Sequence, residues 1–272
     1  MKPTFFLYDD DGADTTFMAP TLGDEATRRG VDLAFIRGRE IAAGVLDHPH
    51  ALLLVLPGAQ SGQKYRDALG TTGCAAIHRA VQSGLAILGT CAGGYLLAET
   101  IDYAKEIPGS EKRLPLSPLA MFNATARGEL PFLPYHLDNP LRGWHRAASA
   151  RVGFTGTEAD IMYWGGGMLI PTAGENNLSV IARYAGLPGQ PIAVAAKSVG
   201  HGVALFSGVH SEVSGHALLH TTGVDLFDPQ DNGRWRHSLA YRLLKYETER
   251  RALWQLKVKH LLQARRAQEA LN

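Results

Sequence analysis

Short apolar runs alternate with helical patterns over the first ninety residues, and this order restricts the fold more than any other feature. The runs cover residues 4–8, 31–36, 51–56 and 85–88, and helical segments separate them at 16–29, 39–46 and 65–83. The run 51–56 is apolar throughout, as in a strand covered on both faces. Strands that alternate with helices pair in parallel through right-handed crossovers. We therefore predict an α/β fold with a mostly parallel central sheet, and an interruption of the first helix near Pro20.

The alternation ends after residue 98, and the middle of the chain has a different character. Six prolines divide residues 99–145 into loops and short pieces. We expect a loop-rich insertion or lid over 100–145, from which Tyr135, His136 and Trp144 reach the site. Beyond it, antiparallel strands are expected at 147–154, 160–163, 169–170, 178–184 and 191–198, and a buried strand at 202–209.

The C-terminal stretch, from about 236 to 270, predicts one or two helices with an apolar stripe. From His237 onward it holds eight Lys and Arg against three Glu, a net charge of +5. One interpretation is an arm that binds RNA or an acidic partner. The favoured interpretation is a helix packed on its own domain or on another subunit, so a partner protein or a second copy of the chain is a candidate to contact these helices.

The charge and the cysteine content exclude several classes of protein. The net charge of +1 argues against a general nucleic-acid binder. Two cysteines, Cys74 and Cys91, provide no disulfide framework. The apolar start of the chain is too short for a signal peptide, and no run approaches the roughly 20 apolar residues of a membrane span. We expect a cytoplasmic protein with no membrane partner.

Cys91 is the leading candidate for chemistry. It follows the apolar strand 85–88 through Gly89-Thr90, and Ala92-Gly93-Gly94 come before an apolar helical run. This order suits a nucleophile elbow, a sharp strand-to-helix turn with a strained apex. The helix dipole at such an apex favours the thiolate form of a cysteine. The alternative is a buried structural cysteine followed by a glycine turn.

The segment Gly208-Val209-His210-Ser211-Glu212 supplies a candidate base. His210 and Glu212 share one face of an extended segment that follows a buried strand, so the carboxylate can orient the imidazole. The ends of parallel strands meet at one edge of a sheet, which predicts that His210 lies near Cys91. The alternative is a histidine of a surface loop.

Two further sets of residues are candidates for the same site. The turn Leu56-Pro57-Gly58-Ala59 follows a strand, and the backbone N–H groups of Gly58 and Ala92 are candidates for an oxyanion hole. Tyr163, Trp164, Gly165 and Gly166 are candidates to line the substrate pocket, the alternative being a bulged strand end. His216 and His220 are interpreted as a surface pair, and we expect neither a metal ion nor a cofactor.

These motifs resemble the class I glutamine amidotransferase-like superfamily, and more closely the biotin-protein ligase N-terminal-domain-like family within it. The second resemblance rests on Tyr8-Asp9-Asp10, on the turn at Gly58 and on the motifs of Cys91, Trp164 and His210. It implies a flavodoxin-like three-layer sandwich with an antiparallel β extension and C-terminal helices. It also implies a Cys91-His210-Glu212 triad. Residues 1–220 would form the superfamily domain and residues 221–272 a helical extension.

The sequence departs from the glutaminases of the superfamily at two places. Ala59 stands where they have a second glycine, and Gly94-Tyr95 stands where they have a substrate-binding glutamine. The resemblance therefore does not establish glutamine as substrate, and Tyr95 joins the candidates for the pocket. Nor does it imply biotin ligation, which takes a separate catalytic domain.

The function predicted from these motifs is that of a hydrolase or amidotransferase that acts on an amide or related carbonyl of a small molecule through a thioester. The alternative is a non-catalytic module that binds a metabolite or a partner and retains the triad.

Overall fold

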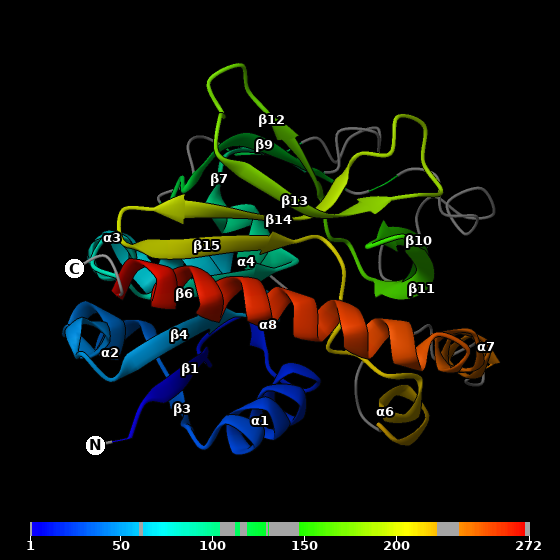
Figure 1. Ribbon diagram of the computed structural model, residues 1–272, viewed down its shortest axis with the longest axis horizontal. Helices are drawn as coiled ribbons and strands as arrows, with labels where there is room; N and C mark the ends of the chain where they lie inside the picture. The colour runs from blue at the N-terminus through cyan, green and yellow to red at the C-terminus, as the bar shows by residue number, and fades with distance from the viewer. Residues whose placement is uncertain are drawn as a thin grey trace.

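The computed structural model describes residues 2–59, 62–103, 112–114, 119–128, 130, 147–221 and 234–269. Its centre is a run of parallel strands in the spatial order β3-β1-β4-β6-β15 (Figure 1). Their bounds are β1 Thr4–Tyr8, β3 Asp32–Ile36, β4 Ala51–Leu56, β6 Ala86–Thr90 and β15 Gly202–Ser207. In chain order this arrangement is 2-1-3-4-5, which is the flavodoxin-like order.

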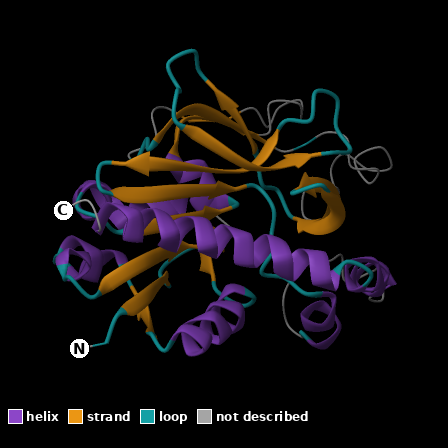
Figure 2. Ribbon diagram, in the orientation of Figure 1, coloured by secondary structure: helices purple, strands orange, loops and turns teal. Residues whose placement is uncertain are grey.

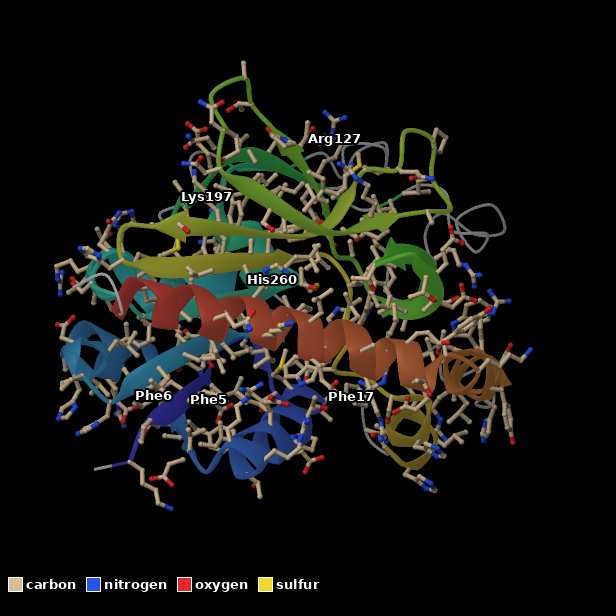
Figure 3. All side chains as sticks on the ribbon, in the orientation of Figure 1. Phe5, Phe6, Phe17, Arg127, Lys197 and His260 are labelled. Carbon is tan, nitrogen blue, oxygen red and sulfur yellow. The ribbon has the colours of Figure 1, made fainter. Side chains whose placement is uncertain are left out.

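Helices cover both faces of the parallel sheet (Figure 2). Helices α1 (Met18–Arg29) and α8 (Glu247–Glu269) contribute to the apolar core on one face. Helices α2 (Gly38–Ala42) and α3 (Gly62–Gln82) contribute to the core on the other. Successive residues of β1 alternate between these cores: Phe5 belongs to the first and Phe6 packs against the second (Figure 3). The predicted three-layer sandwich is confirmed.

The sheet continues beyond β15 as an antiparallel extension, as expected. Strand β14 (Ile192–Val199) pairs antiparallel with β15 and on its other side with β12 (Met168–Pro171) and β13 (Leu178–Tyr184). Strand β13 also pairs with β10 (Ala148–Phe154), and β10 forms an antiparallel hairpin with β11 (Thr157–Tyr163). The extension therefore brings the end of β11 toward the end of β15, where Met162 and His210 form a β-bridge.

The first helix is not interrupted near Pro20, so that expectation is wrong. Helix α1 begins at Met18 and ends at Arg29, with Gly30 in the left-handed conformation after it. Pro20 lies in the first turn, where the helix needs no N–H from it, and its fixed φ suits the helix.

The segment expected to consist of loops also contains regular strands. Strand β7 (Ala98–Tyr103) pairs in parallel with β9 (Phe122–Gly128), and β8 (Lys112–Leu114) pairs with β7. In β9 the buried positions alternate with more exposed ones, as in a strand that covers a core on one face. Tyr135, His136 and Trp144, the residues expected to reach the site from a lid, lie outside the described residues.

The C-terminal region forms two helices, α7 (Arg234–Leu244) and α8, after the short helix α6 (Gly215–His220). Helix α8 crosses the parallel sheet and packs on β6 and β15 (Figure 1). Leu253, Trp254, Val258 and Leu261 bury its apolar stripe in the same core as Phe5. The boundary near residue 220 stays a prediction. In the described part of the chain, every helix is too short or too polar to span a bilayer.

Candidate active site

Cys91 occupies the sharp turn between β6 and helix α4 (Ala92–Leu97). Its φ of 53° and ψ of −114° lie in a region that L-residues rarely adopt, the strain expected at a nucleophile elbow. Glycines permit the turn: a Cβ at Gly93 would lie 2.2 Å from the Leu56 carbonyl oxygen, and one at Gly89 would lie 2.5 Å from that of Gly93. The Cys91 N–H donates to the Ser207 carbonyl at 2.9 Å, which fixes the elbow to the end of β15.

His210 and Glu212 follow β15 and interact through their side chains. His210 Nδ1 lies 2.7 Å from Glu212 Oε1, and both side chains are almost fully buried. The His210 N–H donates to the Met162 carbonyl at 2.8 Å, and Thr21 donates its hydroxyl to the Glu212 carbonyl at 2.9 Å. A backbone contact from β11 and a side-chain hydroxyl from α1 therefore hold the backbone of this pair in place.

Gly58 shows how close the elbow and the imidazole are. A Cβ built at Gly58 would lie 3.2 Å from His210 Cε1 and 3.8 Å from Cys91 Cβ, so one small backbone position contacts both. Gly58 is held by a short strand, β5 (Gly58–Ala59), that pairs with β2 (Ala13–Asp14). The structure therefore brings Cys91, His210, Glu212 and Gly58 together, with Ala92 next to the cysteine at the start of α4.

The charges in this cluster are strongly coupled. Burial acts to lower the pKa of His210, but the Glu212 carboxylate and the Cys91 side chain outweigh it and raise that pKa to about 10. Burial acts to raise the pKa of Glu212, but His210 and then Lys257 hold it below its usual value. In the described part of the chain, His210 Nε2 and Glu212 Oε2 have no hydrogen-bond partner. With a pKa near 10 the imidazole is protonated at neutral pH, so Nε2 carries a proton on the side that faces away from Glu212.

The thiol of Cys91 points to the segment after β11, where its Sγ donates to the Trp164 carbonyl at 3.2 Å. Glycines bring this segment against the end of β15, since a Cβ at Gly166 would lie 2.1 Å from the Gly208 carbonyl oxygen. The Tyr163 hydroxyl is buried and donates to the Gly166 carbonyl at 2.7 Å. These glycines thus permit close contact between two backbone segments.

Tyr95 of α4 reaches the same segment, where its hydroxyl donates to the Gly165 carbonyl at 3.1 Å. Gly165 has a φ of 67°, a conformation that favours glycine. Trp164 thus contacts the sulfur, and Tyr95 and Tyr163 bond to the two glycines that follow it. The contact of these five residues with a substrate stays a prediction.

Sequence reasoning missed Lys257, a residue of α8 whose side chain contacts the segment that carries His210. Its side chain is fully buried, and its Nζ donates to Ser207 Oγ at 3.2 Å and to Ser211 Oγ at 2.9 Å. A signal was present, because Lys257 lies on the apolar stripe of α8 with Trp254, Val258 and Leu261. A charged residue on a buried stripe indicates a specific partner.

The chain thus has a parallel sheet in the flavodoxin-like order, with a cysteine after one central strand and a His–Glu pair after the neighbouring strand. Solved structures share this fold. A glutamine amidotransferase from Thermotoga maritima superimposes with a TM-score of 0.55 at 12% identity, covering 96% of this chain and 99% of that one. One from Methylobacillus flagellatus gives 0.52 at 14% identity, covering 96% of each chain.

The chain belongs to the family described as biotin-protein ligase, N terminal, whose pattern matches residues 47–266. A biotin–protein ligase of Schizosaccharomyces pombe is 28% identical over 195 residues, which cover 70% of this chain. The match covers 29% of the length of that ligase.

Proposed function

We propose that this chain is a cysteine-nucleophile hydrolase or amidotransferase that acts on an amide or related carbonyl of a small molecule. The observation that carries the proposal is the strained Cys91 beside His210, whose other ring nitrogen faces Glu212 at 2.7 Å. Nucleophile, base and orienting carboxylate are the three parts that acyl transfer through a thioester requires. Biotin ligation is not part of the proposal, because it proceeds through an adenylate and this site offers a thiol.

The proposed reaction has two steps. In the reactive form the proton of Cys91 already resides on His210 Nε2, and the thiolate attacks the carbonyl carbon to form a tetrahedral oxyanion. The oxyanion collapses, the bond to the leaving group breaks, and His210 passes the proton to that group. Water or an amine, deprotonated by His210, then attacks the thioester and releases the sulfur.

Each neighbouring group has a defined part in this proposal. Glu212 holds the imidazole and stabilises its protonated form. The N–H groups of Ala92 and Gly58 are the candidate donors to the oxyanion. Before the attack, the Cys91 sulfur must move away from the Trp164 carbonyl oxygen, which lies 3.2 Å from it.

The test is the alkylation of Cys91 by iodoacetamide at pH 7, followed by intact mass. The other cysteine, Cys74, is a suitable internal reference, because burial raises the pKa of its thiol to about 11. We expect Cys91 to react at least tenfold faster than a free thiol, and His210→Ala to remove that advantage. A slow rate that His210→Ala leaves unchanged would contradict the proposal and favour a module that binds a metabolite or partner.

A further inference from the structure

Lys257 joins helix α8 to the segment that carries His210. Its ammonium group donates to the hydroxyls of Ser207 and Ser211, one before and one after the histidine. Ser207 in turn donates to the Val209 carbonyl at 2.8 Å. The backbone on both sides of the imidazole is therefore connected to a single side chain, 45 positions further along the sequence than Glu212.

Arg250 adds a second connection from the same face of α8. It is 6% exposed, donates to the Ser211 carbonyl, and forms an ion pair with Glu247 at 2.7 Å. Arg250 and Lys257 are two helical turns apart, so both cations point from α8 toward the turn that follows β15.

The charges of Lys257 and Glu212 influence each other's proton affinity. Burial lowers the pKa of Lys257 to about 8, while Glu212 acts to raise it and Arg250 acts to lower it. The same lysine contributes to the lowered pKa of Glu212. The ammonium group is therefore a second cation for a carboxylate whose first partner is His210.

An ammonium group in this place is unfavourable for packing alone. Its transfer from water is costly, and an apolar side chain of similar length, such as methionine, would fill the same space. Buried charges of this kind are typical of sites where geometry or charge has a function.

We propose that Lys257 is a positioning residue for the His210–Glu212 pair, so that helix α8 completes the site. It holds the segment 207–211 through two hydroxyls and keeps the Glu212 carboxylate charged and turned to the imidazole. The inference rests on the proposed function, because it assigns Lys257 to the site in which Cys91 is the nucleophile.

The principal test compares Lys257→Met with wild type, both in a Cys74→Ser background. The first measurement is the alkylation rate of Cys91 from pH 5 to 10, in which sulfur displaces iodide from iodoacetamide. The second is the titration of the His210 ring by ¹⁵N NMR, with the signal assigned by its loss in His210→Gln. Lys259→Met is the matched control, because Lys259 is an exposed lysine on the same helix.

In Lys257→Met the Glu212 carboxylate loses a cation, and burial then favours its neutral form. His210 then loses its charged partner, so we expect the pKa of its ring to fall by at least one unit. We also expect the alkylation rate of Cys91 at pH 7 to fall at least tenfold. Lys259→Met should match wild type in both. In a Glu212→Gln background, Lys257→Met should no longer shift the titration, since the lysine acts through the carboxylate.

The titration is influenced by every charged or titratable group facing the pair. Among the residues that the structure describes, these are Cys91 from the elbow, Tyr65 and Tyr184 near the sulfur, and Lys257 and Arg250 from α8. The tyrosines remain neutral over the range, because burial raises the pKa of both well above its usual value. Differences between Lys257→Met and wild type can then be assigned to the lysine.

A folded Lys257→Met protein with the wild-type titration and a rate within twofold of wild type would overturn the inference. If Lys257→Met does not fold, the double variant Ser207→Ala/Ser211→Ala decides. This variant leaves the lysine in place and removes both hydroxyl acceptors. A lower pKa of the His210 ring then supports the proposal, and an unchanged pKa rejects it. If wild-type Cys91 is itself unreactive, the proposed function fails, and the NMR titration alone decides the role of Lys257.

Discussion

At the scale of single residues, the site consists of the paired side chains of His210 and Glu212 next to the strained turn at Cys91. The carboxylate of Glu212 is the main group that keeps the His210 imidazole protonated against burial. Glu212 Oε1 contacts Nδ1, so this carboxylate determines both the orientation of the ring and its proton affinity. Its role can be tested without removing the shape of the side chain.

Glu212→Gln should lower the pKa of His210 by at least one unit. The amide can still bond Nδ1 but carries no charge, so the main upward influence is lost and burial continues to lower the pKa. The measurement is the ¹⁵N ring titration of His210. A pKa that stays near 10 in the folded variant would mean that another group, such as the Cys91 sulfur, holds the proton.

The pairing of Cys91 with His210 was predictable, because both follow strands whose ends meet at one edge of a parallel sheet. The contact of the thiol with the Trp164 carbonyl was not. The direction of a backbone carbonyl after β11 depends on how the antiparallel extension bends toward β15, and residue types do not encode that directly.

At the scale of elements, the elbow depends on the close approach of α4 to β4. A Cβ at Gly93 would meet the oxygen, the carbon and the Cβ of Leu56 within 2.7 Å, and strand backbone cannot shift without disturbing the sheet. The glycine is therefore a requirement of packing, independent of any chemistry at Cys91.

Gly93→Ala should destabilise the fold by about 2–4 kcal/mol, the range of overpacking combined with backbone displacement. The measurement is unfolding by urea. Gly174→Ala is the control, because a Cβ there meets nothing within 4 Å, and its unfolding free energy should stay within about 0.5 kcal/mol of wild type. Equal effects of the two substitutions would refute the packing argument.

Elements with strong local patterns were predicted well, and elements defined by their neighbours were not. The run Ala51–Leu56 is apolar at every position, and β4 has those bounds. Strand β9 was missed, because its alternation of phenylalanine, alanine and glycine with polar residues is weakly apolar and lies among prolines. The stripe of α8 was visible in the sequence, but its partner, the face formed by β6 and β15, is a property of the assembled sheet.

At the scale of the whole molecule, α8 links the stability of the fold to the charges of the site. Its apolar stripe shares a core with β1, β4 and α1, and its lysine lies against the end of β15. Three buried groups, Glu212, His210 and Lys257, titrate differently in the folded and unfolded chain. Stability should therefore depend on pH through each of them, with signs that can be separated.

Lys257 has its pKa lowered to about 8 from a usual value of 10.5. Between these values the unfolded chain binds the proton and the folded chain does not, so wild type should gain stability as the pH rises through this window, relative to Lys257→Met. His210 has the opposite sign. Its pKa is raised from 6.5 to about 10, so its stabilising contribution is complete below pH 6.5 and is lost as the pH rises to 10.

Urea unfolding of wild type, Lys257→Met and His210→Gln from pH 6 to 10.5 separates the two contributions. The difference between wild type and Lys257→Met should rise with pH above 8, and the difference between wild type and His210→Gln should fall above 6.5. Each slope is limited to about 1.4 kcal/mol per pH unit, the value for one proton. Parallel curves for all three proteins would mean that neither group changes its proton affinity on folding, and the buried charge network would then have no energetic link to the fold.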